Sequence, residues 1–203
     1  MDIQKFYKLK VWDIGEEQAD NCHGRSDKDG VVLHETVSPD YPGWSDIRGV
    51  SEYLDNKDYG IHGIVDYEGN IAWAIGKGNC LFYHTASSGS KGSGNINTRK
   101  MGIELISTTP PRHLTRYQKL RWWLRRERQL QNTAKLLATL ARAWDFPLEY
   151  KDPSLAGVTT HWDVTQRYGV PGGHVDCHPY HKGGYFPVLR LIQYAKAWKA
   201  LGY

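Results

Sequence analysis

Two apolar runs of the sequence decide the fold, and the first of them is Val31-Val32-Leu33-His34-Glu35-Thr36. Short continuous runs of β-branched and aliphatic residues are typical of buried strands. His34 stands at the end of the apolar part of this run, where a strand can present a side chain to an active-site face. The second run, Met101-Gly102-Ile103-Glu104-Leu105-Ile106, predicts another strand with one carboxylate among apolar neighbours.

The segments around these runs add a hairpin and several helices. Residues 61–66 and 71–75, joined by a turn that contains Gly69, predict a β-hairpin. Apolar residues at helical spacing over 114–144 predict a long helical stretch with a break or kink near 125–128.

Two further helices complete the pattern. Ser45 can begin a short helix that carries Ile47, Val50 and Leu54, and a last helix is expected over about 188–201. Strands with helices packed between and after them predict an α/β fold with a central sheet, and the length suits a single domain.

The composition excludes several classes of protein. A chain of 203 residues with 40% hydrophobic and 24% charged residues suits one compact domain. No apolar run approaches the roughly 20 residues of a membrane span, and the first residues lack the pattern of a secretion signal. Cys22, Cys80 and Cys177 are too few, and odd in number, for a disulfide framework. We therefore expect a protein made in a reducing cytoplasm.

Positive charge is concentrated in one segment, although the net charge is only +4. Its basic residues, opposed there only by Glu127, are Arg112, Arg116, Lys119, Arg121, Arg125, Arg126 and Arg128. Such a block either forms a solvated helix face or favours a polyanion such as nucleic acid, phospholipid or anionic cell wall. Trp122 and Trp123 could stack on nucleic-acid bases, but nothing else in the chain favours that partner.

Three stretches that lie far apart carry metal-ligating side chains next to a predicted strand or turn. They are residues 31–34, 159–163 and 174–176. Two imidazoles and one carboxylate make the ligand set of a catalytic zinc ion, which keeps a fourth position open for water. Zinc can bring the pKa of that water to about 7. If the stretches converge, the sequence predicts a metal-dependent hydrolase.

Four landmarks, taken in order, resemble those of the zinc-dependent N-acetylmuramoyl-L-alanine amidases, the type-2 amidase family. They are VVLHET (31–36), YHTA (83–86), MGIEL (101–105) and THWDV (160–164). The family includes phage endolysins, bacterial muropeptide amidases and peptidoglycan recognition proteins. The resemblance implies a single amidase domain over 1–203, with a mixed sheet flanked by helices and zinc at one end of a substrate groove. The family core would span about 28–203, and the basic segment, about 110–128, resembles a helical insertion.

The resemblance makes His34 and His161 the two imidazole ligands of zinc. The third ligand of the family is an Asp or a Cys just before a Pro-Gly turn, where this chain reads Asp176-Cys177-His178-Pro179-Tyr180. Relatives that read Asp-Pro-Gly-Pro-Tyr align Asp176 with the metal, whereas relatives that read Cys-Pro-Gly favour Cys177. We expect Asp176, and Cys177 remains the alternative.

The resemblance also implies two catalytic residues. Glu104, held in an apolar strand beside the metal, would act as general base and acid. His174 falls where many members carry a lysine, and a cation there can stabilise the oxyanion of the tetrahedral intermediate. Some phage amidases use a tyrosine just before the histidine that matches His62. That position is Ile61 here, with Tyr59 nearby, so the glutamate variant fits better.

Four side chains are expected to contact the substrate. His84 resembles a histidine that lines the groove of the family, whereas His62 is expected to support a strand or a ligand. Tyr83 and Trp162, with Tyr180, would form apolar walls against sugar or peptide, although aromatic residues more often belong to a core.

The sequence therefore predicts a zinc-dependent peptidoglycan amidase that hydrolyses the bond between N-acetylmuramic acid and L-alanine. We expect a monomeric phage endolysin, made without a signal peptide and acting on the cell wall after release, with a cytosolic wall-recycling amidase as near relative. The segment from Arg112 to Arg128 is expected to contact an anionic cell-wall polymer. The alternative is a non-catalytic peptidoglycan-binding module of the same fold.

Overall fold

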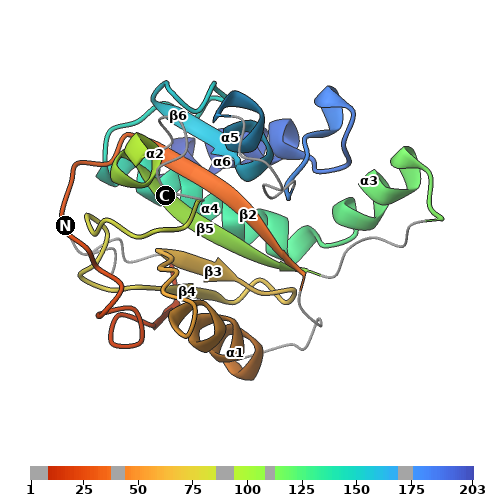
Figure 1. The fold of residues 1–203 in the computed structure, drawn as a ribbon. Helices are drawn as coiled ribbons and strands as arrows, with labels where there is room; N and C mark the ends of the chain where they lie inside the picture. Colours follow the sequence, from red (N-terminus) through yellow and green to blue (C-terminus); the bar gives the residue numbers. More distant parts are fainter. Residues whose placement is uncertain (1–8, 38–43, 86–93, 108–112, 169–175) are drawn as a thin grey trace.

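One mixed sheet organises the computed structural model, which describes residues 9–37, 44–85, 94–107, 113–168 and 176–203. The strand order of this sheet is β1-β4-β3-β5-β2-β6, and Figure 1 labels the last five of these strands. The strands are β1 (Val11–Asp13), β2 (Gly30–Val37), β3 (Gly63–Val65), β4 (Ile71–Trp73), β5 (Lys100–Ser107) and β6 (Gly157–Thr160).

Most neighbouring strands of the sheet are parallel. β2 pairs with β5 along its full length and with β6 over the first half. Among the strand pairs of the described residues, β3 and β4 form the antiparallel one, which confirms the predicted hairpin. β2 is longer than expected and continues to Val37, so His34 lies inside the strand rather than at its end.

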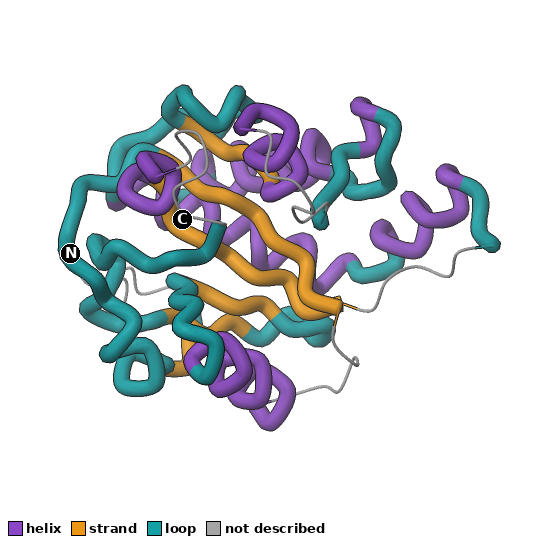
Figure 2. The backbone as a smooth tube through the Cα atoms, in the orientation of Figure 1, coloured by secondary structure: helices purple, strands orange, loops and turns teal. Residues whose placement is uncertain are grey.

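Helices cover both faces of the sheet, which confirms the predicted α/β fold (Figure 2). The helices are α1 (Trp44–Asp55), α2 (Gly94–Arg99), α3 (Arg116–Leu124), α4 (Glu127–Ala143), α5 (His161–Tyr168) and α6 (Val188–Ala200). Because side chains alternate along a strand, Leu33 packs against α4 and α6, whereas Val32 packs against α2 and α5. Helix α1 packs against β3 and β4 on the Val32 side.

The long helical stretch divides into α3 and α4 where the sequence predicts a break. Thr115 begins α3 with a capping box, in which its side chain accepts from the Gln118 backbone N–H. Between the helices, the buried Arg126 guanidinium lies 3.9 Å from the Trp122 ring centroid. Arg126 is therefore part of the packing rather than part of an exposed basic face.

A disulfide joins Cys22 to Cys80, which the cysteine count did not predict. The expectation that three cysteines form no disulfide framework did not anticipate this bridge, and Cys177 remains a free, buried thiol. The bridge ties the segment after β1 to the loop that follows β4. Among the residues that the structure describes, no helix combines the length and apolar composition of a membrane span.

Candidate metal centre

Strand register brings the predicted ligands together. His34 on β2 pairs with Glu104 on β5, so both side chains project from the same face of the sheet. Leu33 pairs with Thr160, the last residue of β6. His161, the next residue and the first of α5, therefore lies beside His34. The face that they share is the one covered by α1, α2 and α5.

The ligand atoms of three residues lie within 4.8 Å of one another, those of His34, His161 and Asp176. The Nδ1 atoms of His34 and His161 are 3.1 Å apart. The carboxylate of Asp176 places Oδ1 3.1 Å from Nδ1 of His161 and Oδ2 3.6 Å from Nδ1 of His34. Both imidazoles are buried and Asp176 is partly buried.

Asp176 and Cys177 lie in different surroundings. The Glu35 backbone N–H donates to Oδ2 of Asp176 at 3.2 Å, and the Trp162 N–H donates to its carbonyl at 3.1 Å. Cys177 has a left-handed backbone with φ of 55° and packs within the core against α4 and α6. Burial raises the pKa of its thiol well above the usual value, which disfavours the thiolate that a metal needs. The structure thus brings the Asp176 carboxylate, and not Cys177, to the imidazoles.

Glu104 is the carboxylate nearest to this group on the sheet. Its Oε1 lies 3.9 Å from Nδ1 of His34, and the side chain is buried. Burial, and then the negative charges of Asp176 and Glu35, raise the pKa of Glu104 well above its usual value. Such a carboxyl holds a proton more tightly than an exposed one and suits proton transfer near neutral pH.

A family model described as N-acetylmuramoyl-L-alanine amidase matches residues 24–178, well over half of the sequence. The chain belongs to the N-acetylmuramoyl-L-alanine amidase family. It is therefore an enzyme, and its activity is that of a peptidoglycan amidase.

Solved structures share the fold of this amidase. The Staphylococcus aureus hydrolase AmiA, in complex with its ligand, is 16% identical with a TM-score of 0.58, over 96% of this chain and 80% of that chain. PlyL is 16% identical with a TM-score of 0.55, over 93% and 96% of the two chains. The PlyG catalytic domain is 18% identical with a TM-score of 0.53, over 94% and 93%. A comparison with curated protein sequences gave no match.

His84 and His62 lie next to the candidate metal centre, on the inner side of His34. Nδ1 of His84 is 3.1 Å from Nε2 of His34, and its Nε2 is 3.0 Å from the Lys100 carbonyl. Burial is the main reason that the pKa of His84 falls to about 3. His62 contacts the Cys80 carbonyl and accepts from the Gly102 N–H, and its pKa is also lowered by burial. Both rings are therefore neutral parts of the interior.

The positions of the other predicted residues do not test the roles that the sequence predicts for them. Trp162 is partly buried and stacks on His178 with ring centroids 4.4 Å apart, whereas Tyr83 stacks on His23 at 4.3 Å. The substrate-binding roles of Trp162 and Tyr83 stay predictions. His174, the predicted oxyanion-stabilising residue, lies outside the described residues.

The structure also describes the position at which some phage amidases carry a tyrosine, just before the histidine that matches His62. Ile61 belongs to the core under α1, whereas Tyr59 is half exposed in the turn before it. Ile61 has no group that can transfer a proton, so this position cannot serve as the tyrosine does. The role of Glu104 in the glutamate variant stays a prediction.

The sequence reasoning missed a second buried carboxylate next to a ligand. Glu35 points to the opposite face of β2 from His34 and accepts from the Ser107 hydroxyl at 2.8 Å. Burial raises the pKa of Glu35 to about 7, and the Ser107 hydrogen bond opposes that shift. The available signal was a carboxylate inside a β-branched run, the same signal that singled out Glu104.

Asp163 is another buried carboxylate near a predicted ligand, and its contacts stabilise the start of α5. Its carboxylate accepts from the backbone N–H and hydroxyl of Thr160 and from the Tyr150 hydroxyl, and it pairs with Lys182 at 2.8 Å. These contacts fix the junction of β6 and α5, and with it the position of His161.

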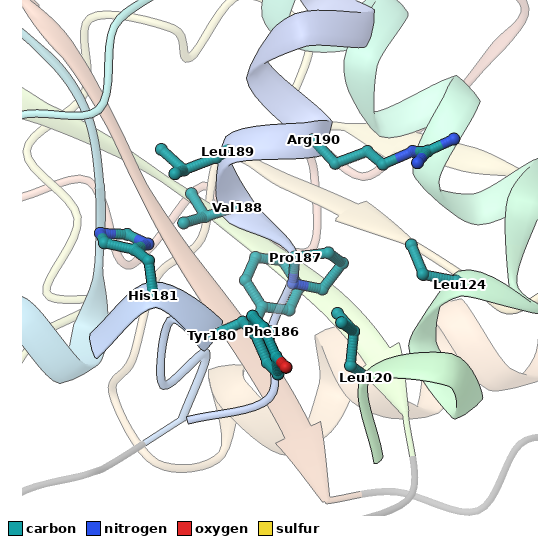
Figure 3. Close-up of a pocket in the computed structure, with 9 residues that line it drawn as sticks. All are labelled: Leu120, Leu124, Tyr180, His181, Phe186, Pro187, Val188, Leu189 and Arg190. Carbon is teal, nitrogen blue, oxygen red and sulfur yellow. The ribbon is translucent and has the colours of Figure 1, made fainter. Parts of the chain in front are cut away.

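A separate apolar pocket of about 230 Å³ lies between α3 and the start of α6 (Figure 3). Leu120 and Leu124 line it from α3, and Phe186 and Val188 line it from the other side. Arg190 lies at its edge. None of the grouped metal-ligating side chains lines this pocket.

Proposed function

We propose that the enzyme is a zinc amidase that hydrolyses the bond between the lactyl group of N-acetylmuramic acid and L-alanine in the cell wall. The observation that carries this proposal is the convergence of two imidazoles and the Asp176 carboxylate beside the buried Glu104. A binding module of the same fold would not need this complete arrangement of ligands and proton-transfer group.

The donor set fits zinc in chemistry and in spacing. Two ligand atoms about 2.0–2.1 Å from a tetrahedral zinc ion lie about 3.3 Å apart. The Nδ1 atoms of His34 and His161 are 3.1 Å apart, and the Asp176 carboxylate is 3.1 Å from the second of them. Three protein ligands leave one position of the ion for water.

Zinc, when bound, lowers the pKa of a water molecule and polarises the carbonyl of the substrate. Glu104 would take a proton from the water that attacks the amide carbon. The same carboxyl then gives the proton to the nitrogen of L-alanine as the carbon–nitrogen bond breaks. His174 would stabilise the oxyanion of the tetrahedral intermediate, as the sequence predicts.

The decisive experiment uses purified peptidoglycan and the zinc-loaded enzyme. We expect the appearance of free L-alanine amino termini in proportion to zinc content, and the loss of both on substitution of His34 by Ala. Binding of walls by a zinc-loaded sample without new amino termini would support the non-catalytic module instead.

We further propose that the enzyme is an endolysin that acts on intact walls after release from the cytoplasm. A recycling amidase of the same family would prefer small soluble muropeptides. The expected result is a higher rate on insoluble sacculi than on isolated muropeptides, compared at equal concentrations of the scissile bond. A preference for soluble muropeptides would favour the recycling role.

An anionic cell-wall polymer is the proposed partner of α3. Arg116, Arg121 and Arg125 expose their side chains on or just after this helix, and Arg190 lies across the apolar pocket (Figure 3). Positive charge of this density attracts polyanions. The buried Arg126 does not belong to this surface.

Two exposed arginines provide the test of this partner. Substitution of Arg121 and Arg125 by Gln should weaken the binding of whole walls at low salt and reduce its salt dependence. The matched control is the same change at Arg48 and Arg142, which are exposed elsewhere. Equal wall affinity for both double variants would remove α3 from the interaction.

A further inference from the structure

We infer that His84 is a positioning residue that fixes the tautomer of His34, so that Nδ1 of His34 keeps the lone pair that a metal needs. His84 would then act through His34 instead of touching the substrate. The inference depends on the proposed zinc function only for the identity of the ion, because the tautomer can be measured in the metal-free protein.

The backbone of β5 determines the tautomer of His84. Nε2 of His84 lies 3.0 Å from the carbonyl oxygen of Lys100. A carbonyl oxygen can only accept a hydrogen bond, so Nε2 of His84 carries a proton. Burial favours the neutral ring, and a neutral imidazole has only one N–H. Nδ1 of His84 is therefore an acceptor.

The tautomer of His84 in turn determines the tautomer of His34. Nε2 of His34 lies 3.1 Å from Nδ1 of His84, so the His34 ring donates its single N–H there. Its other nitrogen, Nδ1, is then unprotonated. That atom is the one which faces Nδ1 of His161 at 3.1 Å and Oδ2 of Asp176 at 3.6 Å. A hydrogen bond on one imidazole nitrogen thus determines which nitrogen can ligate a metal.

Without His84, the local chemistry would favour the opposite tautomer. An N–H on Nδ1 of His34 could donate to the His161 nitrogen or to the Asp176 carboxylate, which are both close acceptors. That arrangement would block the ligand atom of His34. The acceptor on His84 offers the competing hydrogen bond that keeps the proton away from the metal centre.

The position of the His84 ring is also fixed by packing. A Cβ atom on Gly102 would lie 2.5 Å from Cγ of His84 and 2.5 Å from Cδ1 of Ile61. The absence of a side chain on Gly102 therefore leaves the space in which the ring lies. Because Gly102 and Lys100 both belong to β5, one strand supplies the space and the hydrogen-bond acceptor.

The test measures histidine tautomers by long-range nitrogen–proton NMR on the metal-free, nitrogen-15-labelled enzyme. We expect both His34 and His84 of the unmodified chain to be protonated on Nε2. In the variant His84→Leu, His34 should move to the Nδ1-protonated form. In His84→Asn the side-chain carbonyl can replace the acceptor, and His34 should keep its proton on Nε2. The exposed His113→Leu is the matched control.

Zinc affinity, measured by competition with a chelator, gives the second readout. We expect binding about 10–100-fold weaker for His84→Leu, with much of the loss recovered in His84→Asn and no change in His113→Leu. Protonation of His34 on Nδ1 in the unmodified chain would overturn the inference. So would a tautomer or an affinity that His84→Leu leaves unchanged. If His84→Leu does not fold, the tautomers of the unmodified chain and of His84→Asn decide. Absence of zinc binding by the unmodified chain would refute the proposed function instead.

Discussion

Asp176 and Cys177 are adjacent in the chain, yet only one of them faces the imidazoles. Asp176 lies against His34 and His161, whereas Cys177 packs in the core. We expect Asp176→Asn to lose most of its zinc affinity, because a neutral amide replaces the charged ligand. Cys177→Ser should keep the zinc stoichiometry. Metal analysis of the two purified variants checks this, and a Cys177→Ser protein without zinc would reverse the assignment.

Substitution of Glu104 should affect the reaction rate and not the binding of zinc. Substitution by Gln keeps the size of the side chain but removes the proton-accepting group. We expect kcat to fall about 10²–10⁴-fold, with zinc content unchanged. Comparison of the rate with metal analysis on the same sample separates the two effects. A variant that retains its rate would exclude Glu104 as the general base.

Lys28 makes stability depend on pH. Its buried ammonium donates to the Asn97 and Thr98 carbonyls, and burial lowers its pKa to about 7 from 10.5. Between these values the unfolded chain binds more protons than the folded one. The Lys28 contribution to the free energy of unfolding should therefore rise from pH 7 to pH 10 and be lost below about pH 7.

Denaturant unfolding of the unmodified chain and of Lys28→Met measures this contribution. The difference between their free energies of unfolding should grow in favour of the unmodified chain by at most about 1 kcal/mol per pH unit. Lys57→Met, on an exposed side chain, is the matched control. A difference that stays constant over this range would show that Lys28 is charged in the fold.

At the level of single residues, the candidate centre could be predicted through a family resemblance and not through geometry. The spacing of His34, His161 and Asp176 along the chain contains no information about their distance in space. Glu35 was missed although, like Glu104, it is a carboxylate within an apolar run. The roles of His174, Tyr83 and Trp162 stay predictions.

At the level of elements, the contact between β2 and β6 depends on two glycines. A Cβ on Gly30 would lie 1.9 Å from the carbonyl oxygen of Gly157, which itself has a φ of +134°. We expect Gly30→Ala to lower the free energy of unfolding by about 1–3 kcal/mol or more and to weaken zinc binding. The second effect follows because a displaced β6 moves His161 away from His34.

The control for this change is a glycine with open surroundings. Gly49 is exposed on α1, and a Cβ there would meet nothing within 4 Å. Gly49→Ala should raise the free energy of unfolding by up to about 1 kcal/mol. Thermal unfolding of both variants is the measurement. Equal stability for Gly30→Ala and Gly49→Ala would contradict the close approach of the two strands.

The elements themselves were predictable where their patterns are long. The hairpin of β3 and β4 and the division between α3 and α4 follow from turn residues and helical spacing. β1 was missed because Val11–Asp13 lies in a polar, weakly periodic segment, whereas β3 and β4, also three residues each, lie within longer apolar runs. β6 was expected only as a strand or turn before His161. Its four residues, Gly157–Thr160, are fixed by pairing with β2, and such a contact cannot be read from local sequence.

At the level of the whole molecule, the disulfide closes a large loop. Cys22 and Cys80 are 58 residues apart, and a crosslink of this span restricts the unfolded chain. We expect Cys22→Ser to lower the free energy of unfolding by about 2–4 kcal/mol. A reductant should destabilise the unmodified chain by a similar amount and leave Cys22→Ser unchanged. Insensitivity of the unmodified chain to reductant would show that the two thiols are not joined.

The parallel pairing of β2 with β5 and β6 also affects when the candidate site can form during synthesis of the chain. His34 is made early, Glu104 later, and Asp176 only after both flanking strands exist, so no nascent fragment possesses a working centre. The centre should therefore be complete only when the segment that carries Asp176 lies beside β2, where the Glu35 backbone N–H donates to its carboxylate. We expect a chain that stops before Asp176 to lack both zinc binding and amidase activity.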